Sequence, residues 1–183
     1  VPLYIHIPFC ESLCPFCPFH RIIFDKSLAS EYFHSLTLEV DRLHHLGFKF
    51  NQVYVGGGTP TTMVKELVIL LHKIQSYWPI KDISVETNPN HLSMNILQPL
   101  KDVGVTRLSV GVQSLDDETL KRIGRYDAYG GRDEIIHRLG NIQGQFETFD
   151  VDMIFNLPQQ TEQGIKNDIA ALKALAIDQI TYY

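Results

Sequence analysis

The sequence predicts an α/β fold in which six parallel strands alternate with outer helices. Three observations support this fold class. Short runs of β-forming residues recur along the chain, helical apolar patterns separate them, and polar or glycine-rich residues follow several of the runs. No low-complexity segment or linker interrupts the alternation, and 183 residues fit a single domain.

Each expected strand is a short run of β-branched, aromatic or aliphatic residues. In chain order the runs are residues 3–7, 52–55, 83–87, 107–112, 149–155 and 179–183. Because helical segments separate successive runs, the strands are expected to lie parallel, in a sheet that is open or closed into a barrel. Six strands fall short of a complete eight-stranded barrel, so the sequence predicts a partial (β/α)6 TIM-like barrel.

The first two expected helices carry apolar residues at three- and four-residue steps. One pattern begins at Leu28 and ends before Gly47, which is a plausible left-handed stop. The other runs from Leu67 to Trp78 and is ended by a proline. Both patterns are typical of helices that pack one face against a sheet.

Later helices are indicated by capping residues or by apolar spacing. Asp116 and Thr161 are expected to cap the N-termini of two helices, and residues 135–142 carry the apolar spacing of an extra one. The segment 93–103 is less regular, because Pro99 is expected to kink a continuous helix there.

Composition and charge exclude several classes of function. The chain has 16 Lys and Arg against 21 Asp and Glu, a formal net charge of −5. Because a broad nucleic-acid surface requires a basic face, no nucleic-acid partner is expected. No run approaches the roughly 20 apolar residues of a membrane span. Three cysteines packed into eight residues make a poor disulfide framework, which indicates a reducing, cytoplasmic location.

The cysteines form the sharpest motif. Cys10, Cys14 and Cys17 follow the first strand with the spacing Cys-x3-Cys-x2-Cys. Three thiolates on one short loop can hold three corners of a 4Fe–4S cluster and leave the fourth iron open to another ligand. Structural zinc usually takes four protein ligands, and His6 or His20 could supply the fourth. The spacing favours an iron–sulfur cluster over zinc or over three thiols without a metal.

Polar residues also collect where the expected strands end. In a parallel α/β sheet, the carboxyl ends of the strands are where ligands bind. A glycine-rich turn at residues 56–59 would let backbone groups approach a ligand closely, although taken alone the glycine run is a weak signal and a simple tight turn is the better explanation. Glu86 and Asp152 fall inside apolar runs, where an unpaired carboxylate is costly, and are therefore candidate site residues.

The cysteine motif, with Phe16 before its last cysteine, resembles the radical S-adenosylmethionine (SAM) superfamily. The opening Tyr-Ile-His-Ile-Pro-Phe-Cys is similar to the branch that contains oxygen-independent coproporphyrinogen III oxidases, haem chaperone-like proteins and class C methyltransferase-like proteins. Further motifs of that branch recur in order: Gly-Gly-Gly-Thr-Pro-Thr at 56–61, Val-Glu-Thr-Asn-Pro at 85–89, Gly-Val-Gln-Ser at 111–114, Gly-Arg at 124–125, and Asp-Met-Ile at 152–154 followed by Leu-Pro-Gln-Gln-Thr at 157–161.

The resemblance implies one radical SAM core domain over residues 1–183, expected to be a fragment of a longer protein whose C-terminal part contacts the substrate. It implies a 4Fe–4S cluster on Cys10, Cys14 and Cys17, and one or two SAM molecules that are reductively cleaved to a 5′-deoxyadenosyl radical. An electron donor such as flavodoxin or ferredoxin and a small-molecule substrate are the implied partners. No catalytic side chain is predicted. The residues that match SAM contacts of the family are Tyr4, Phe16, Gly57, Gly58, Thr59, Glu86, Gln113, Arg125 and Asp152.

Among these residues, Arg125 is expected to pair with the methionine carboxylate of SAM, because a guanidinium can bind a carboxylate bidentately. Glu86 and Gln113 are suited to ribose hydroxyls or an ammonium group. Phe16 would present backbone groups to the adenine edge, and Tyr4 would lie near SAM at the barrel floor.

Three positions depart from the patterns of the branch. Phe19 stands where coproporphyrinogen oxidases of this type carry a further cysteine, and Asp127 stands where the chaperones carry histidine in Gly-Arg-x-His. Asn156 replaces a glycine before Leu-Pro, as in some class C radical SAM methyltransferases. The resemblance therefore favours class C-type methyl transfer to an aromatic, heterocyclic or tetrapyrrole substrate. A haem chaperone-like binding protein and an anaerobic coproporphyrinogen III oxidase, an oxidoreductase, are the alternatives.

Overall fold

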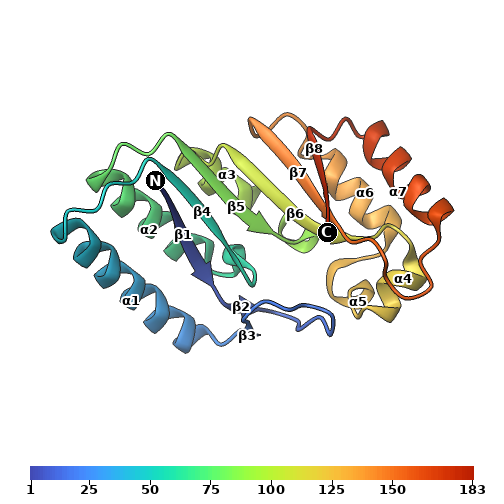
Figure 1. Cartoon of the computed structure of the whole chain (residues 1–183), viewed down its shortest axis with the longest axis horizontal. Helices are drawn as coiled ribbons and strands as arrows, with labels where there is room; N and C mark the ends of the chain where they lie inside the picture. The colour runs from blue at the N-terminus through green and yellow to red at the C-terminus, as the bar shows by residue number, and fades with distance from the viewer.

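A six-stranded parallel sheet forms the centre of the computed structural model, which describes all residues 1–183 (Figure 1). The strands lie side by side in the order in which they occur along the chain, as in part of a barrel. All six predicted strands are confirmed, with ends shifted by one or two residues. They are β1 (Pro2–Ile7), β4 (Gln52–Gly57), β5 (Asp82–Thr87), β6 (Arg107–Gln113), β7 (Thr148–Met153) and β8 (Gln179–Tyr182).

Helices connect successive strands. They are α1 (Lys26–His45), α2 (Val64–Tyr77), α3 (Met94–Asp102), α4 (Asp117–Arg122), α5 (Tyr126–Tyr129), α6 (Arg132–Gly140) and α7 (Glu162–Ala174), with short 3-10 turns η1 (Pro60–Met63) and η2 (Pro89–His91). Both predicted caps are confirmed: Asp116 accepts a hydrogen bond from Thr119 N at 2.8 Å, and Thr161 accepts one from Gly164 N at 3.0 Å. Gly47 adopts φ +81° after α1, as predicted.

Pro99, where the sequence predicted a kink, lies inside helix α3 and does not interrupt it. Helix α3 runs through this proline as one nine-residue element. A proline at this position removes one backbone hydrogen bond, and the fully buried side chains of Leu97 and Leu100 anchor the helix on both sides of it. Burial of these two side chains therefore outweighs the tendency of proline to interrupt a helix.

Two very short strands were not predicted. In β2 and β3, Phe9 pairs with Ile22 and Cys10 pairs with Ile23 (Figure 1). Two residues cannot show a periodic pattern, so the sequence carried no signal for them. This pairing closes the segment between Cys10 and Ile22 into a loop directly beyond the carboxyl end of β1. That segment, residues 10–22, is called the cysteine loop below.

The two faces of the sheet differ in polarity, which places the functional site. In β6, Leu108, Val110 and Val112 are completely buried and alternate with Ser109 and Gln113. The apolar set belongs to a core of 36 buried residues, which also includes the buried leucines and isoleucine of α2. Because successive residues of a strand point to opposite faces, the polar set lines the inner face of the partial barrel.

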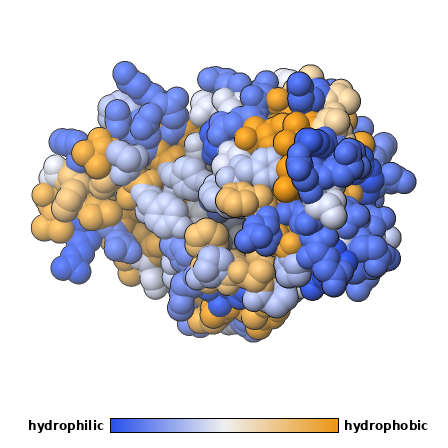
Figure 2. Space-filling view, turned by 45° about the vertical axis from the view of Figure 1, so that its right-hand side comes forward, coloured by the Kyte–Doolittle hydropathy of each residue, from blue (hydrophilic) through white to orange (hydrophobic).

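The face of the molecule shown in Figure 2 carries both hydrophilic and hydrophobic residues, and the hydrophobic ones gather in several areas among the hydrophilic ones. None of the helices combines the length and the apolar character that crossing a bilayer requires.

Candidate functional site

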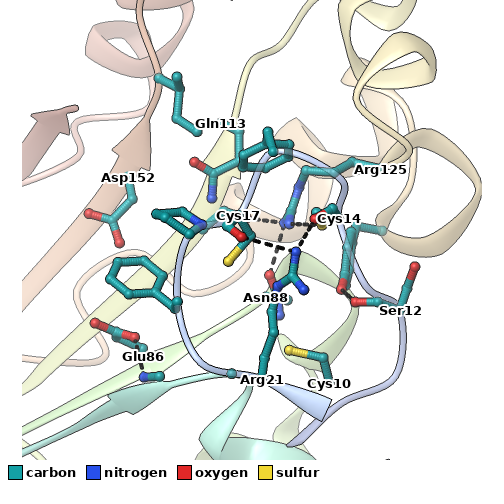
Figure 3. A pocket seen from close by; sticks show the side chains of 18 of the residues that line it. Cys10, Ser12, Cys14, Cys17, Arg21, Glu86, Asn88, Gln113, Arg125 and Asp152 are labelled. Carbon is teal, nitrogen blue, oxygen red and sulfur yellow. Dashed lines mark hydrogen bonds between the residues drawn. The ribbon is translucent and has the colours of Figure 1, made fainter. Parts of the chain in front are cut away.

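A cavity of about 380 Å³ opens at the carboxyl ends of the central strands (Figure 3). Ligand pockets in proteins usually measure about 300–1,000 Å³. The cysteine loop forms one wall, and the ends of β4, β5, β6 and β7 contribute the others. This is the edge of a parallel sheet at which ligands are expected to bind.

All three cysteines of the predicted metal motif line this cavity. Cys10 and Cys14 are buried, Cys17 is half-buried, and Cys17 N donates a hydrogen bond to Cys14 O at 3.2 Å. Burial raises the pKa of the Cys10 thiol, and a hydrogen bond from the Thr59 hydroxyl acts in the opposite direction. A bound cation would displace such a thiol proton, because the thiolate is the form that binds metal.

The two histidines considered as zinc ligands lie elsewhere. The His6 ring nitrogen Nε2 lies 2.8 Å from His20 O and donates to it, while Nδ1 lies 3.0 Å from the Tyr4 hydroxyl. Neither histidine lines the cavity. No three His, Cys, Asp or Glu side chains are placed to hold a single metal ion. Neither His6 nor His20 therefore completes a ligand set with the cysteines.

The glycine-rich turn is required by close approaches within the chain. A Cβ at Gly56 would lie 2.8 Å from the Glu86 carboxylate, and one at Gly58 would lie 2.7 Å from Phe9 O. Gly57 adopts φ +116°, and its N–H donates to Glu86 Oε2 at 3.1 Å. Glu86 also accepts a hydrogen bond from the Tyr54 hydroxyl at 2.7 Å. The turn and the Glu86 carboxylate therefore form one hydrogen-bonded side of the cavity.

Arg125 is buried, with 4% of its surface exposed, and reaches the cavity wall from the segment after α4. Its guanidinium donates to Gly111 O at 2.6 Å, to Asn88 Oδ1 at 2.8 Å and to Cys14 Sγ at 3.3 Å. It also lies 4.0 Å from the centre of the Tyr129 ring, and its Nε has no partner. None of these partners is a carboxylate. Because a buried cation without a counter-charge is costly, this environment suits an anionic ligand.

Gln113 reaches the cavity through an irregularity of β6. The register between β6 and β7 shifts between Gly111 and Gln113, and Gln113 adopts φ +74°. Such a conformation is uncommon for residues other than glycine, asparagine and aspartate, and bulges commonly re-aim a side chain beside a functional site.

Asp152 projects from β7 onto the polar inner face. It accepts a hydrogen bond from Ser109 Oγ at 2.6 Å. Burial raises the pKa of Asp152 to about 6, and the nearby carboxylates of Asp150 and Glu86 add to this effect. Asp150 is completely buried behind it, where it pairs with Arg107.

Seven of the nine predicted SAM contacts line the cavity: Phe16, Gly57, Gly58, Glu86, Gln113, Arg125 and Asp152. Thr59 lies one layer behind, because its hydroxyl contacts Cys10 Sγ at 3.8 Å and accepts from Asn88 Nδ2 at 2.7 Å. Tyr4 lies outside the lining, is largely exposed and stacks on Tyr54.

Three polar residues in or behind the cavity wall were not predicted from the sequence. Arg21 lines the cavity and donates a hydrogen bond to Cys17 O within the cysteine loop, and Asn88 forms hydrogen bonds with both Arg125 and Thr59. His91 is buried between Thr61 Oγ1 at 2.7 Å and Glu11 Oε2 at 3.1 Å, which links η1, η2 and the residue after Cys10. The sequence did contain a signal for two of these residues, Asn88 and Arg21. Asn88 belongs to the strand-end motif at 85–89, and Arg21 is the single charged residue between Glu11 and Asp25.

The sequence profile of the Radical SAM superfamily matches residues 4–172, and the chain belongs to this superfamily of enzymes. Its members use a 4Fe–4S cluster and SAM as cofactors. Among individual relatives, the haem chaperone HemW of Bacillus subtilis is 33% identical over 98% of this chain and 49% of its own. The oxygen-independent coproporphyrinogen III oxidase of Escherichia coli is 30% identical over 99% of this chain and 41% of its own. The chain thus spans about half the length of these relatives, or less.

Solved structures agree with the fold. The E. coli coproporphyrinogen III oxidase HemN, described as a radical SAM enzyme, superposes with a TM-score of 0.86 at 27% identity, over 98% of this chain and 43% of its own. This match confirms the predicted α/β fold of a partial TIM-like barrel. The radical SAM methyltransferase TsrM of Kitasatospora setae superposes with a TM-score of 0.70 at 14% identity, over 99% of this chain and 35% of its own. At that identity the likeness shows the fold alone.

The residues present fit the cofactors of the superfamily. Three cysteine thiols line one cavity, and Arg125 donates a hydrogen bond to the thiol of Cys14. A buried guanidinium beside them lacks a counter-charge and has an unpartnered nitrogen. The chemistry of the donor set therefore matches an iron–sulfur cluster together with a carboxylate-bearing ligand.

Proposed function

We propose that this chain is the cofactor-binding core of a radical SAM enzyme, in which Cys10, Cys14 and Cys17 hold the 4Fe–4S cluster. One observation carries this proposal: the three cysteines and seven of the nine expected SAM contacts line a single cavity. When bound and reduced by a donor such as flavodoxin or ferredoxin, the cluster supplies one electron for the cleavage of SAM to a 5′-deoxyadenosyl radical.

The side chains around the cavity bind and orient SAM in this proposal. Arg125 provides the fixed positive charge for the methionine carboxylate, since a guanidinium stays protonated in proteins. Glu86 and Asp152 offer carboxylate acceptors on the inner face, and the amide of Gln113 offers both a donor and an acceptor. Phe16 supplies backbone groups for the adenine edge. Thr59 supports this arrangement through Cys10 and Asn88.

Apolar residues exclude water from the reacting groups. The cavity that holds the cysteines is also lined by the apolar residues Phe16, Pro18, Ile154 and Leu157. Burial around an iron–sulfur cluster tunes its potential, and exclusion of water protects reactive intermediates from side reactions. These residues therefore have a chemical role in addition to packing.

We further propose a tetrapyrrole or another aromatic ring as the substrate class. The relatives named for porphyrin or haem, at 30–33% identity, support this class. So do Phe19 and Tyr183, which line the cavity although most of each side chain is exposed. Aromatic side chains at a pocket mouth favour a planar ring, because stacked or edge-on aromatic contacts are stabilising.

A haem chaperone-like protein is the second candidate function, and the 33% identity to HemW favours it. Asp127, which stands where the chaperones carry histidine, is an exposed residue of α5. Class C-type methyl transfer, which the sequence alone favoured, gains no further support, because the likeness to TsrM shows only the fold. Asn156 adopts φ +63°, so asparagine replaces glycine here for a conformational reason that does not identify the reaction.

Anaerobic SAM cleavage tests the proposal. The reconstituted protein, reduced with dithionite, is expected to release 5′-deoxyadenosine from SAM, and Cys14→Ala is expected to release none. Mass analysis of products formed with a porphyrinogen or haem then separates the reactions: loss of carbon dioxide indicates decarboxylation, and a gain of one methyl group indicates methyl transfer. Haem binding without any 5′-deoxyadenosine would favour the chaperone, and absence of both activities would refute the proposal.

A further inference from the structure

The structure assigns to Arg21 two linked roles, positioning of the cysteine loop and supply of a fixed positive charge that favours the reduced cluster. This inference rests on the proposed function, because it concerns the cluster that Cys10, Cys14 and Cys17 would hold. Neither the predicted SAM contacts nor the motifs of the sequence include Arg21.

One nitrogen of the Arg21 guanidinium bridges two of the cysteine residues. Nη2 donates to the backbone oxygen of Cys14 and, at 3.2 Å, to that of Cys17 (Figure 3). Cys17 N also donates to Cys14 O at 3.2 Å, and this is the one backbone–backbone hydrogen bond formed within residues 11–21. Arg21 therefore supplies most of the hydrogen bonding that shapes the turn between the second and third cysteines.

The backbone of Arg21 is itself anchored at the base of the loop. The next residue, Ile22, donates its N–H to Pro8 O at 2.8 Å and pairs with Phe9 in the short sheet. From this fixed position the side chain extends across the loop toward Cys14 and Cys17 (Figure 3). A side chain held at its base and at its tip resists motion of the segment between the two points.

Arg21 also brings a positive charge to the cavity that the three cysteines line. It is the single charged residue between Glu11 and Asp25, and no carboxylate of the chain forms a salt bridge with it. One-electron reduction adds one negative charge to a cluster without making or breaking a protein bond. A nearby cation stabilises that charge, and net charge and hydrogen bonding are known determinants of iron–sulfur potentials.

Two substitutions separate the roles. Arg21→Gln removes the charge, and Arg21→Lys keeps it but cannot reproduce the planar donor geometry. The control is Arg42→Gln, on the exposed side of α1. In a redox titration followed by electron paramagnetic resonance, Arg21→Gln is expected to lower the reduced-to-oxidised ratio of the cluster about tenfold at a fixed potential, a shift of about 59 mV for one electron. Arg21→Lys is expected to stay near the wild type, and Arg42→Gln to equal it.

The positioning role has a separate readout in the cluster-free protein. Hydrogen exchange of the backbone amides in residues 11–21 is expected to be faster in both Arg21 variants than in Arg42→Gln. An unchanged reduction potential of the cluster in Arg21→Gln would overturn the charge role. Unchanged hydrogen exchange of the cysteine loop in both variants would overturn the positioning role. If Arg21→Gln binds no cluster, the hydrogen-exchange data still test the positioning role. A potential of Arg21→Lys far from that of the wild type would then overturn the charge role, because this variant keeps the charge. Failure of the wild type to bind a cluster would instead refute the proposed function.

Discussion

Arg125 shows how much the chemistry of one side chain depends on burial. At an exposed helix end, an arginine contributes little, and its replacement usually costs about 0.5 kcal/mol or less. Here the guanidinium is buried among an amide, a carbonyl, a thiol and an aromatic ring, and no carboxylate of the chain balances its charge. The site therefore offers an anion a binding position that the sequence motif alone only implied.

Substitution of Arg125 by lysine tests that position. Arg125→Lys keeps a positive charge but loses the planar fork, and we expect SAM binding to weaken by about 1–3 kcal/mol. The iron content should stay unchanged, because no cysteine is altered. Calorimetric titration of SAM into the reconstituted variant measures the loss, with Arg122→Lys on the exposed surface of α4 as the control. Equal affinities of the wild type and Arg125→Lys for SAM would show that Arg125 does not bind the carboxylate.

Asp152 gives the site a pH dependence. Because burial raises the pKa of Asp152 in the folded chain to about 6, from an ordinary value of 3.8, the folded protein binds this proton more tightly than the unfolded protein does. The free energy of unfolding should therefore fall as the pH rises from about 4 to about 6, and the full cost should be present above that range.

Asp152→Asn should remove this fall. In urea titrations of the cluster-free protein, the variant should match the wild type near pH 4 and exceed its stability near pH 7, by at most about 3 kcal/mol. Asp127→Asn, an exposed substitution in α5, serves as the control. Parallel stability curves for the wild type and Asp152→Asn across this range would contradict the assignment.

At the scale of elements, the regular pattern was predictable and the shortest segments were not. The six strands and the caps at Asp116 and Thr161 follow from periodicity and local hydrogen bonding, which act within a few residues. The pairing of Phe9 with Ile22 joins residues that are apart in the chain, and its two-residue strands carry no periodic signal. Pro99 shows the reverse case, in which tertiary burial outweighs a clear local preference.

The glycine turn after β4 allows a test of element packing. A Cβ at Gly58 would lie 2.7 Å from Phe9 O and 2.8 Å from Pro8 C, so the β1–β2 connection would have to move. We expect Gly58→Ala to destabilise the fold by about 1–3 kcal/mol, as measured by urea unfolding. At Gly140, in α6, the nearest atom to a new Cβ is Leu175 Cδ2 at 3.8 Å, and Gly140→Ala should stabilise by up to about 1 kcal/mol. Similar effects of the two substitutions would contradict this packing.

For the whole molecule, the topology explains why the site could be predicted in outline. The carboxyl ends of adjacent parallel strands meet at one edge, so residues at the ends of β4 to β7 were expected to converge, and they line one cavity. Contacts that depend on how the loops fold back over that edge could not be predicted. Two examples are the contact between His91 Nε2 and Glu11 Oε2 and the hydrogen bonds that Arg21 donates to Cys14 O and Cys17 O.

The central claim is that Cys10, Cys14 and Cys17 hold a 4Fe–4S cluster with one iron open to SAM. The most direct test is anaerobic reconstitution, followed by iron and sulfide analysis and electron paramagnetic resonance of the reduced protein. We expect about four irons and four sulfides per chain, a signal that changes when SAM is added, and loss of the cluster when any one of the three cysteines is replaced by alanine. Stoichiometric zinc without labile sulfide, or a reduced signal that SAM leaves unchanged, would contradict the claim.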